Sequence, residues 1–225
     1  LETLQSDDHR MKIRMQQSMA GKKGLTFGVT MTIGEYAVIP SLARFLKAHP
    51  QWEIHICYGN TQTLLSRLRE GTLDFAIVEG YFREDLYTTR ILQKEPFIGV
   101  ASSKHIFQKP VSCLRDLTGE RLLLREHGSG TRAILTKILA LNNLSAEDFS
   151  HIIEIENIHA IVSLLREDCG ISFLYQSAVQ KELEDKTLIE IPLSDFKIAH
   201  DFSFIWNKDS IFSAQYEAIF QELQK

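Results

Sequence analysis

An alternation of short apolar runs with amphipathic segments, present twice in the chain, is the feature that most constrains the fold. In the first half, the runs at residues 25–29, 53–58 and 75–78 predict strands. The segments between them, at about 35–48 and 61–70, repeat apolar residues at helical spacing. A strand–helix–strand–helix–strand order predicts parallel strands joined by right-handed crossovers. The sequence therefore predicts an α/β fold.

The same order recurs in the second half of the chain. Strands are predicted there at residues 121–124, 152–155 and 171–174, again with amphipathic segments between them. Sliding the first unit onto the second aligns Thr32 with Ser129, among other residues. Any two units of this order align partly by period alone, so a shared origin stays open. Both interpretations predict two similarly built lobes.

The C-terminal part predicts one more strand, at residues 200–206, and one more helix. This pair has no partner unit of its own, and its simplest placement is back on the first lobe. The chain then crosses between the lobes twice, as in a hinged, two-lobed binding fold. We expect lobe I at residues 24–96 plus 200–225, and lobe II at 97–199.

The charge balance argues against nucleic-acid binding by this chain itself. Lys and Arg number 25 against 29 Asp and Glu, and the basic residues are scattered, whereas a phosphate backbone requires a basic face. The 3 cysteines form no C-x-x-C pair, a pattern typical of a reduced, cytoplasmic protein. No apolar run approaches the ~20 residues of a membrane span, and no secretory signal opens the chain. Because the chain begins at Leu1 rather than Met, a missing N-terminal piece remains open.

The first residues, 1–19, predict a helix with an interrupted heptad pattern. Its apolar positions fall on one seam: Leu1, Leu4, Met11 and Met15. Asp8 and Ser18 occupy the remaining core positions of that seam. Two interpretations stay open, a surface helix or the tail of a dimerising helix.

Polar loops follow several of the predicted strands, and each precedes a helix. Ligands of open α/β sheets bind beyond the carboxyl ends of the strands. Helix N-termini offer free N–H groups and a partial positive charge, so they hold anions without a cation. We therefore predict an anion-binding cleft. Its candidate residues are Thr30, Met31, Thr32, Asn60, Thr61, His127, Gly128, Ser129, Thr131 and Asn157.

Helix capping is the alternative role for several of these side chains. Asn60 and Asn157 have the residue type that caps a helix, and capping is the favoured role for both. Ser129 lies between two glycines, which let the backbone approach a ligand closely. Glu79 either meets a positive group of the ligand or caps the loop before Gly80.

Catalytic patterns are scarce. The segment from Gly128 to Ala133 matches the dinucleotide pattern G-x-G-x-x-A, but the acidic residues that follow lie in a predicted turn rather than at a strand end. No G-x-S-x-G, H-E-x-x-H or C-x-x-C motif is present. We expect no enzyme, no cofactor and no metal. The alternatives are a solute-binding protein of a transporter and a nucleotide-binding oxidoreductase.

From about residue 23 onward, the chain resembles the effector-binding domain of LysR-type transcriptional regulators. Residues 71–78 are similar to the family's G-x-L-D-x-A-I segment. Residues 25–29 lead into a hydroxyl-rich loop, residues 42–50 resemble the family's helix that ends in a proline, and residues 170–174 resemble its second-lobe strand.

This resemblance implies a periplasmic-binding-protein-like fold of type 2, with two Rossmann-like lobes, a ligand cleft and a homodimer or homotetramer. It implies a domain that senses a small molecule and controls DNA binding and transcription by the full-length protein. Residues 1–23 resemble the end of the family's linker helix, and its winged helix-turn-helix is missing, so DNA is reached only through that part. The pocket positions of the family carry over to Thr30, Thr32, Asn60, Thr61, Ser129 and Thr131.

Overall fold

The computed structural model describes residues 2–19 and 23–224, which form two compact units. Unit 1 consists of Leu1–Gln93 with Asp201–Lys225, and unit 2 of Lys94–His200. The seam position Leu1 and the side chain of Ser18 lie outside the described residues.

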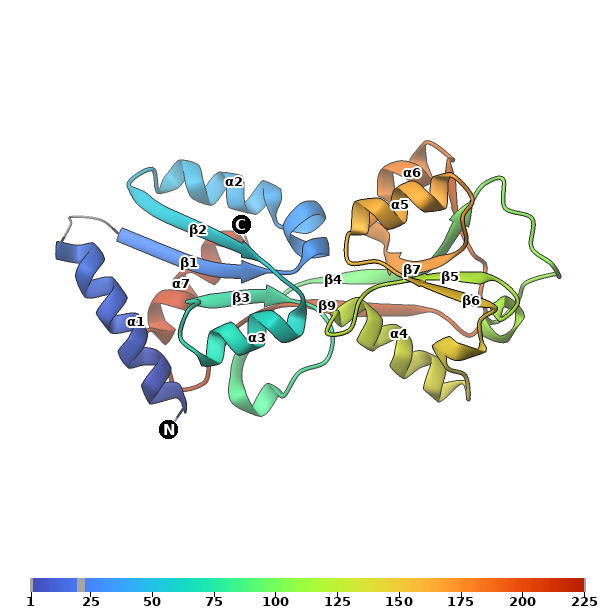
Figure 1. Ribbon diagram of the computed structural model, residues 1–225. Coiled ribbons are helices and arrows are strands. Elements are labelled where there is room, and N and C mark those ends of the chain that lie inside the picture. Colours follow the sequence, from blue (N-terminus) through green and yellow to red (C-terminus); the bar gives the residue numbers. More distant parts are fainter. Residues whose placement is uncertain (1, 20–22, 225) are drawn as a thin grey trace. The chain divides into compact units, whose positions relative to one another are not determined.

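Unit 1 contains a sheet in which β1 (Lys23–Val29) lies between β2 (Trp52–Tyr58) and β3 (Phe75–Val78), all three parallel. Helix α2 (Ile39–Ala48) lies on one face of this sheet and α3 (Thr61–Arg69) on the other (Figure 1). Right-handed crossovers produce this arrangement, because the chain moves from β1 to β2 and then back past β1 to β3. The predicted first unit is confirmed.

The helix expected at 35–48 is divided into two parts. A π-helical segment, η1 (Ile33–Ala37), precedes α2, and the Val38 amide donates to the carbonyl of Ile33 at 2.9 Å. Pro40 stands in the first turn of α2 and has no N–H to donate. A continuous α-helix through this point would lack a backbone hydrogen bond, so the expectation of one unbroken helix was wrong.

The C-terminal pair returns to unit 1, as expected. Strand β9 (Ile198–Asn207) pairs antiparallel with β3, and α7 (Ser213–Leu223) contacts α2. The rings of Phe75 and Phe204 stack across the β3–β9 pair at a centroid distance of 4.2 Å. Helix α1 (Glu2–Met19) contacts β1 and α3 (Figure 1).

Unit 2 contains the second set of strands and helices. Strand β5 (Arg121–Leu124) pairs parallel with β6 (His151–Glu154), and Leu122 on β5 also forms a parallel bridge with Ile171. The helices of this unit are α4 (Gly130–Leu141), α5 (Ile158–Arg166) and α6 (Gln180–Glu184). The 3₁₀ segments of the two units are η2 (Glu84–Leu86), η3 (Leu114–Leu117), η4 (Ala146–Asp148) and η5 (Gln176–Ala178).

One long strand, β4 (Tyr87–Ser102), was not predicted. It begins in unit 1 and continues in unit 2, where β7 (Ser172–Tyr175) and β8 (Leu188–Glu190) pair with it antiparallel. Only its last six residues are continuously buried, and Pro96 lies within it. The apolar signal is therefore confined to a short part of the strand. The chain passes between the units twice, once within β4 and once within β9.

Candidate functional site

A buried polar cluster lies at the carboxyl ends of β1 and β3 in unit 1. Thr30 follows β1, and its hydroxyl donates to the carboxylate of Glu79, which follows β3. The hydroxyl of Thr61, the first residue of α3, donates to the backbone carbonyl of Glu79 at 2.8 Å. All three residues are buried. The structure thus joins two predicted residues to Glu79, which acts as an acceptor for Thr30.

These contacts determine what the two threonines can offer a ligand. A hydroxyl has one proton, and both Thr30 and Thr61 have given theirs to Glu79. Their oxygens retain lone pairs, which accept hydrogen bonds. This cluster therefore suits ligand groups that donate, such as hydroxyl or ammonium groups, rather than a bare anion.

Thr32 differs from its neighbours. Its side chain is 0% exposed, and among the described residues its hydroxyl has no hydrogen-bond partner. It precedes η1 but forms no side-chain cap. A buried hydroxyl without a partner costs about 1–3 kcal/mol, which a ligand group could recover. Short π-helical segments such as η1 also occur frequently at functional sites. Met31, beside Thr32, is half-buried.

Three predicted residues cap helices. Asn60 accepts from the Thr63 amide at 3.0 Å, and Asn157 from the Ala160 amide at 2.9 Å. Ser129 likewise caps α4, accepting from a backbone amide at 3.4 Å. The capping alternative is therefore confirmed for both asparagines, and Ser129 combines capping with its place in the glycine loop.

The loop before α4 carries the remaining candidates in unit 2. Gly128 has a φ of 88°, a conformation that favours glycine and lets the chain turn into the helix. Thr131 in the first turn is buried, whereas His127 is exposed. The Nε2 atom of His127 lies 3.0 Å from Nη2 of Arg132. The structure thus brings these predicted residues together around the N-terminus of α4, a helix of 12 residues.

Arg125 is a candidate that the sequence analysis missed. It directly follows β5, and its side chain is 4% exposed. Nε and Nη2 bond the carboxylate of Glu126 at 2.8 and 3.1 Å, while Nη1 is buried without a hydrogen-bond partner in the described part of the chain. The signal was an arginine between a strand end and a glycine loop. It was overlooked because helix N-termini were expected to hold the anion without a cation.

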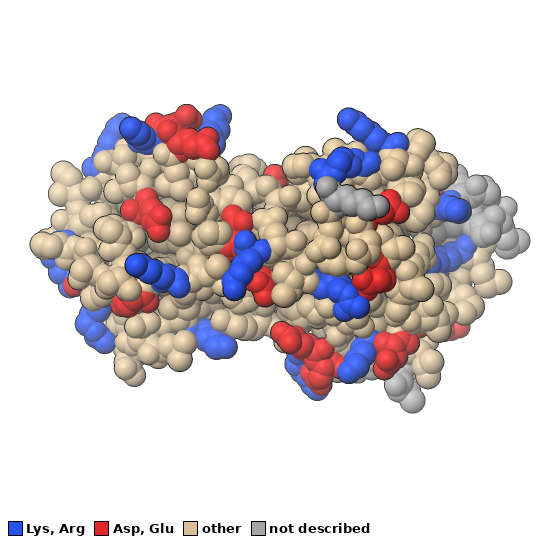
Figure 2. Space-filling view, turned by 180° about the vertical axis from the view of Figure 1, so that it is seen from behind, with Lys and Arg blue, Asp and Glu red and all other residues tan. Residues whose placement is uncertain are grey.

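Other kinds of site find less support. Among residues 2–19 and 23–224, no group of three or more His, Cys, Asp or Glu side chains is placed to hold a metal ion. Within the same residues, no helix is both long and apolar enough to span a bilayer. On the face drawn in Figure 2, Lys and Arg alternate with Asp and Glu rather than forming a basic surface.

The comparison with protein families decides the assignment. Residues 21–225 match the model of the LysR substrate binding domain. The chain belongs to this family. Its structural neighbours are LysR effector-binding domains with the periplasmic-binding-protein-like fold, as expected.

Proteins similar to this LysR domain are named as transcriptional regulators or as their regulatory domains. The chain is 28% identical over 210 residues to a probable RuBisCO transcriptional regulator of Thalassiosira pseudonana, an alignment that covers 90% of this chain and 68% of that protein. The regulatory domain of CcmR from Synechocystis PCC6803, in complex with 2-PG, superposes with a TM-score of 0.78 at 19% identity, covering 90% of this chain and 96% of that one. The effector-binding domain of QuiR in complex with shikimate gives a TM-score of 0.74 at 20% identity, covering 90% and 95%.

Proposed function

We propose that this LysR domain binds a small anionic effector through its polar loops, and thereby controls DNA binding and transcription by the full-length regulator. One observation carries the proposal. Thr32 and Arg125 both follow a strand at its carboxyl end, both are buried, and each has a polar atom without a partner among the described residues. A buried polar atom without a hydrogen-bond partner destabilises the folded state, and a ligand that bonds this atom removes the penalty.

The chemistry of the loops narrows the effector class. Arg125 and the N-terminus of α4 suit a carboxylate, sulfate or phosphate group. Thr30 and Thr61 suit a group that donates hydrogen bonds, because their own protons are engaged. The effector class that we propose is therefore a small acid, and Thr30 and Thr61 favour hydroxyl or amine groups as substituents. The domains of CcmR and QuiR, which hold 2-PG and shikimate, support a small-molecule ligand in general.

Thermal unfolding against a panel of small acids tests the proposal. The panel contains each acid with and without hydroxyl or amine substituents. A ligand present at about 100 times its Kd adds about 2.7 kcal/mol, which raises the Tm by roughly 5–10 °C for a chain of this size. A shift with a hydroxylated or aminated acid, lost in Arg125→Gln and retained in the exposed control Arg115→Gln, supports the site. No shift with any member of the panel contradicts it.

We further propose that the domain has no catalytic activity and that it acts in the cytoplasm. Named relatives are transcriptional regulators, which supports a binding role without catalysis. Cys57, Cys113 and Cys169 are free, which supports a cytoplasmic location. Effector recovered chemically unchanged after prolonged incubation with the domain is the expected result. A product would favour the enzyme alternative instead.

We also propose a homodimer or homotetramer. Strand β2 is an outer strand of its sheet and carries the exposed Tyr58, and α2 beside it exposes Ile39. Strand β6 is likewise an outer strand, and its Ile152 and Ile153 are both exposed. An edge strand with exposed apolar side chains offers unpaired backbone groups and apolar area on which another chain can pair.

Sedimentation of the purified domain tests the proposed assembly. We expect a dimer or tetramer that Ile153→Lys dissociates, because a charge on an edge strand opposes pairing. The exposed control Leu141→Lys, on α4, is expected to leave the assembly intact. A monomeric wild-type domain at high concentration contradicts the proposal.

A further inference from the structure

Helix α1 contacts the rest of unit 1 through its polar face. Ser6, Asp7 and Arg10 are buried, whereas Leu4 and Met11 are 71% and 44% exposed. A surface helix ordinarily does the reverse and buries its apolar side chains. Hydrogen bonds and ion pairs, rather than apolar burial, therefore hold much of α1 in place.

Asp74 is the centre of these contacts. Its side chain is 0% exposed and forms ion pairs with Arg10 and with Arg14, whose Nη2 lies 2.6 Å from Oδ1. It also accepts from the amide of Thr26 at 2.7 Å and from the hydroxyl of Tyr216 at 3.2 Å. Burial, and then the Asp74 carboxylate, raise the pKa of Tyr216 above its usual range, so the phenol remains a neutral donor. One carboxylate thus joins α1 to β1 and α7.

A second group of contacts lies nearer the N-terminus of α1. The carboxylate of Asp7 accepts from the hydroxyl of Ser210 at 2.7 Å and from the amide of Ile211 at 2.9 Å. The hydroxyl of Ser6 donates to the carbonyl of Leu68 at 3.2 Å and accepts from Asn207 at 2.9 Å. These partners belong to α3, to the end of β9 and to the segment between β9 and α7, so α1 contacts several other elements of unit 1.

Gly71 fits the same interface. Its φ is 71°, and a Cβ there would lie 2.6 Å from the backbone oxygen of Ser6. Any larger residue would therefore be strained and would push α1 away. Two positions of the segment 71–77, Gly71 and Asp74, are thus in contact with α1. This contact gives the segment a physical role beyond the start of β3.

We propose that α1 is held to the rest of unit 1 by a polar latch, and that this latch opens while the rest of unit 1 stays folded. On α1 the latch consists of Ser6, Asp7, Arg10 and Arg14. Asp74 is the partner of the two arginines, whereas Ser6 and Asp7 bond the other elements described above. Buried ion pairs contribute little net stability, because desolvation offsets their attraction. With little apolar burial added, the docked and released helix differ little in free energy. The β1–β3–β9 core contains its own stack of Phe27, Phe75 and Phe204, all of which lie outside α1.

The latch concerns the attachment of α1 rather than the effector site, and it does not depend on the binding of an effector. A docked α1 moves together with unit 1, and a released α1 does not. The side chains of Leu4, Met11 and Met15 are exposed to solvent when α1 is docked, and releasing the helix does not bury them.

Backbone amide exchange of the whole chain tests the latch. Arg10→Gln removes the Asp74 ion pair, and we expect the amides of residues 5–15 to exchange more than about tenfold faster. Residues 25–29 and 75–78 are expected to keep their protection. The control Lys12→Gln, which removes only the exposed ion pair to Asp8, is expected to change exchange by less than about twofold.

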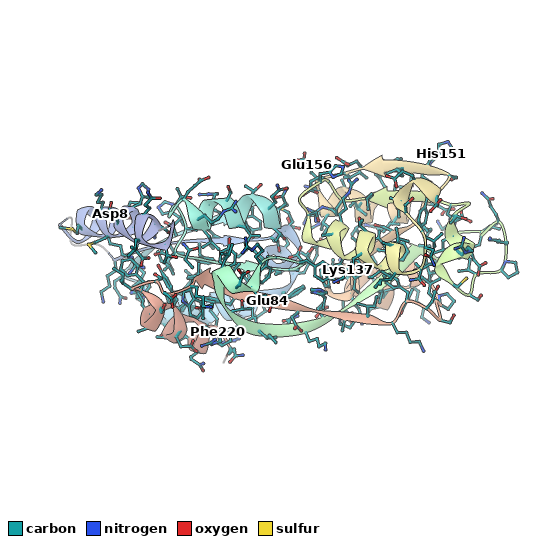
Figure 3. The ribbon with its side chains drawn as sticks, turned by 90° about the horizontal axis from the view of Figure 1, so that it is seen from below. Asp8, Glu84, Lys137, His151, Glu156 and Phe220 are labelled. Carbon is teal, nitrogen blue, oxygen red and sulfur yellow. The ribbon has the colours of Figure 1, made fainter. Side chains whose placement is uncertain are left out.

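Two adjacent aspartates provide an independent pair of variants. Asp7 is buried and bonded to the rest of unit 1. Asp8, on the same helix, is exposed, and Figure 3 labels its place on α1. Asp7→Ala is therefore expected to reproduce the effect of Arg10→Gln, and Asp8→Ala is not. The latch is refuted if α1 keeps its protection in both Arg10→Gln and Asp7→Ala. It is equally refuted if the strands of unit 1 lose protection together with α1, since α1 is then part of the unit 1 core.

Discussion

The two units share a strand–helix order but differ at the loop after the first strand. In unit 1, Thr32 precedes a π-helical segment, forms no cap and has a buried hydroxyl without a partner in the described chain. In unit 2, the aligned Ser129 caps a regular α-helix, and a buried cation, Arg125, stands close before it in the sequence. The same topology thus supplies hydrogen-bonding oxygens in one unit and, in the other, a guanidinium N–H group without a partner among the described residues. Polar loops that look equivalent in the sequence therefore have different roles.

Removing the cation of unit 2 is expected to have the largest effect. Arg125→Gln should weaken effector binding by about 1.5–3 kcal/mol, because hydrogen bonds to a charged group are worth that much. The measurement is calorimetric titration with the acid found in the thermal panel. Arg115→Gln, on an exposed arginine of the same unit, serves as the control. Equal affinity in Arg125→Gln and wild type would place the acidic group elsewhere.

Removing the cap of unit 2 is expected to have the next largest effect, on stability. Ser129→Ala should lower the free energy of unfolding by about 0.5–2 kcal/mol, because α4 loses the acceptor for the Arg132 amide. Urea unfolding measures this change. Thr32→Ala, at the aligned position, should cost less, because Thr32 caps nothing. A larger loss of stability in Thr32→Ala would contradict the difference between the two loops.

Much of the fold could be predicted because its signals are local. The runs that became β3 and β5 are short and apolar, and the asparagines at 60 and 157 cap the helices that follow them. Strand β4 was missed because most of it is only partly buried and its pairing partners lie far along the chain. The division of η1 from α2 depends on Pro40, which the apolar periodicity does not show.

The contacts of particular side chains were less predictable. The heptad seam of α1 directed attention to Leu4 and Met11, yet the face that contacts unit 1 is the polar one. Asp74, the partner of Arg10, lies 64 positions further along the chain, so no local pattern joins them. Arg125 was missed for a different reason. Its bidentate contact to the adjacent Glu126, which leaves one nitrogen without a partner in the described part of the chain, exists only after folding.

Replacing the hydroxyl of unit 1 is expected to have the smallest effect, and its sign separates a ligand contact from a structural one. Thr32→Val keeps the shape of the side chain and removes a buried hydroxyl that has no partner among the described residues. The free domain should therefore be as stable as the wild type or more stable by up to about 1 kcal/mol, while effector affinity falls by about 0.5–1.5 kcal/mol. The exposed Thr63→Val, in the first turn of α3, is the control for both measurements. A structural hydroxyl would produce the opposite result, a loss of stability with affinity unchanged, because its bond would be made within the protein. Only a hydroxyl whose hydrogen-bond partner is the ligand gives a domain that is more stable and yet binds the effector more weakly.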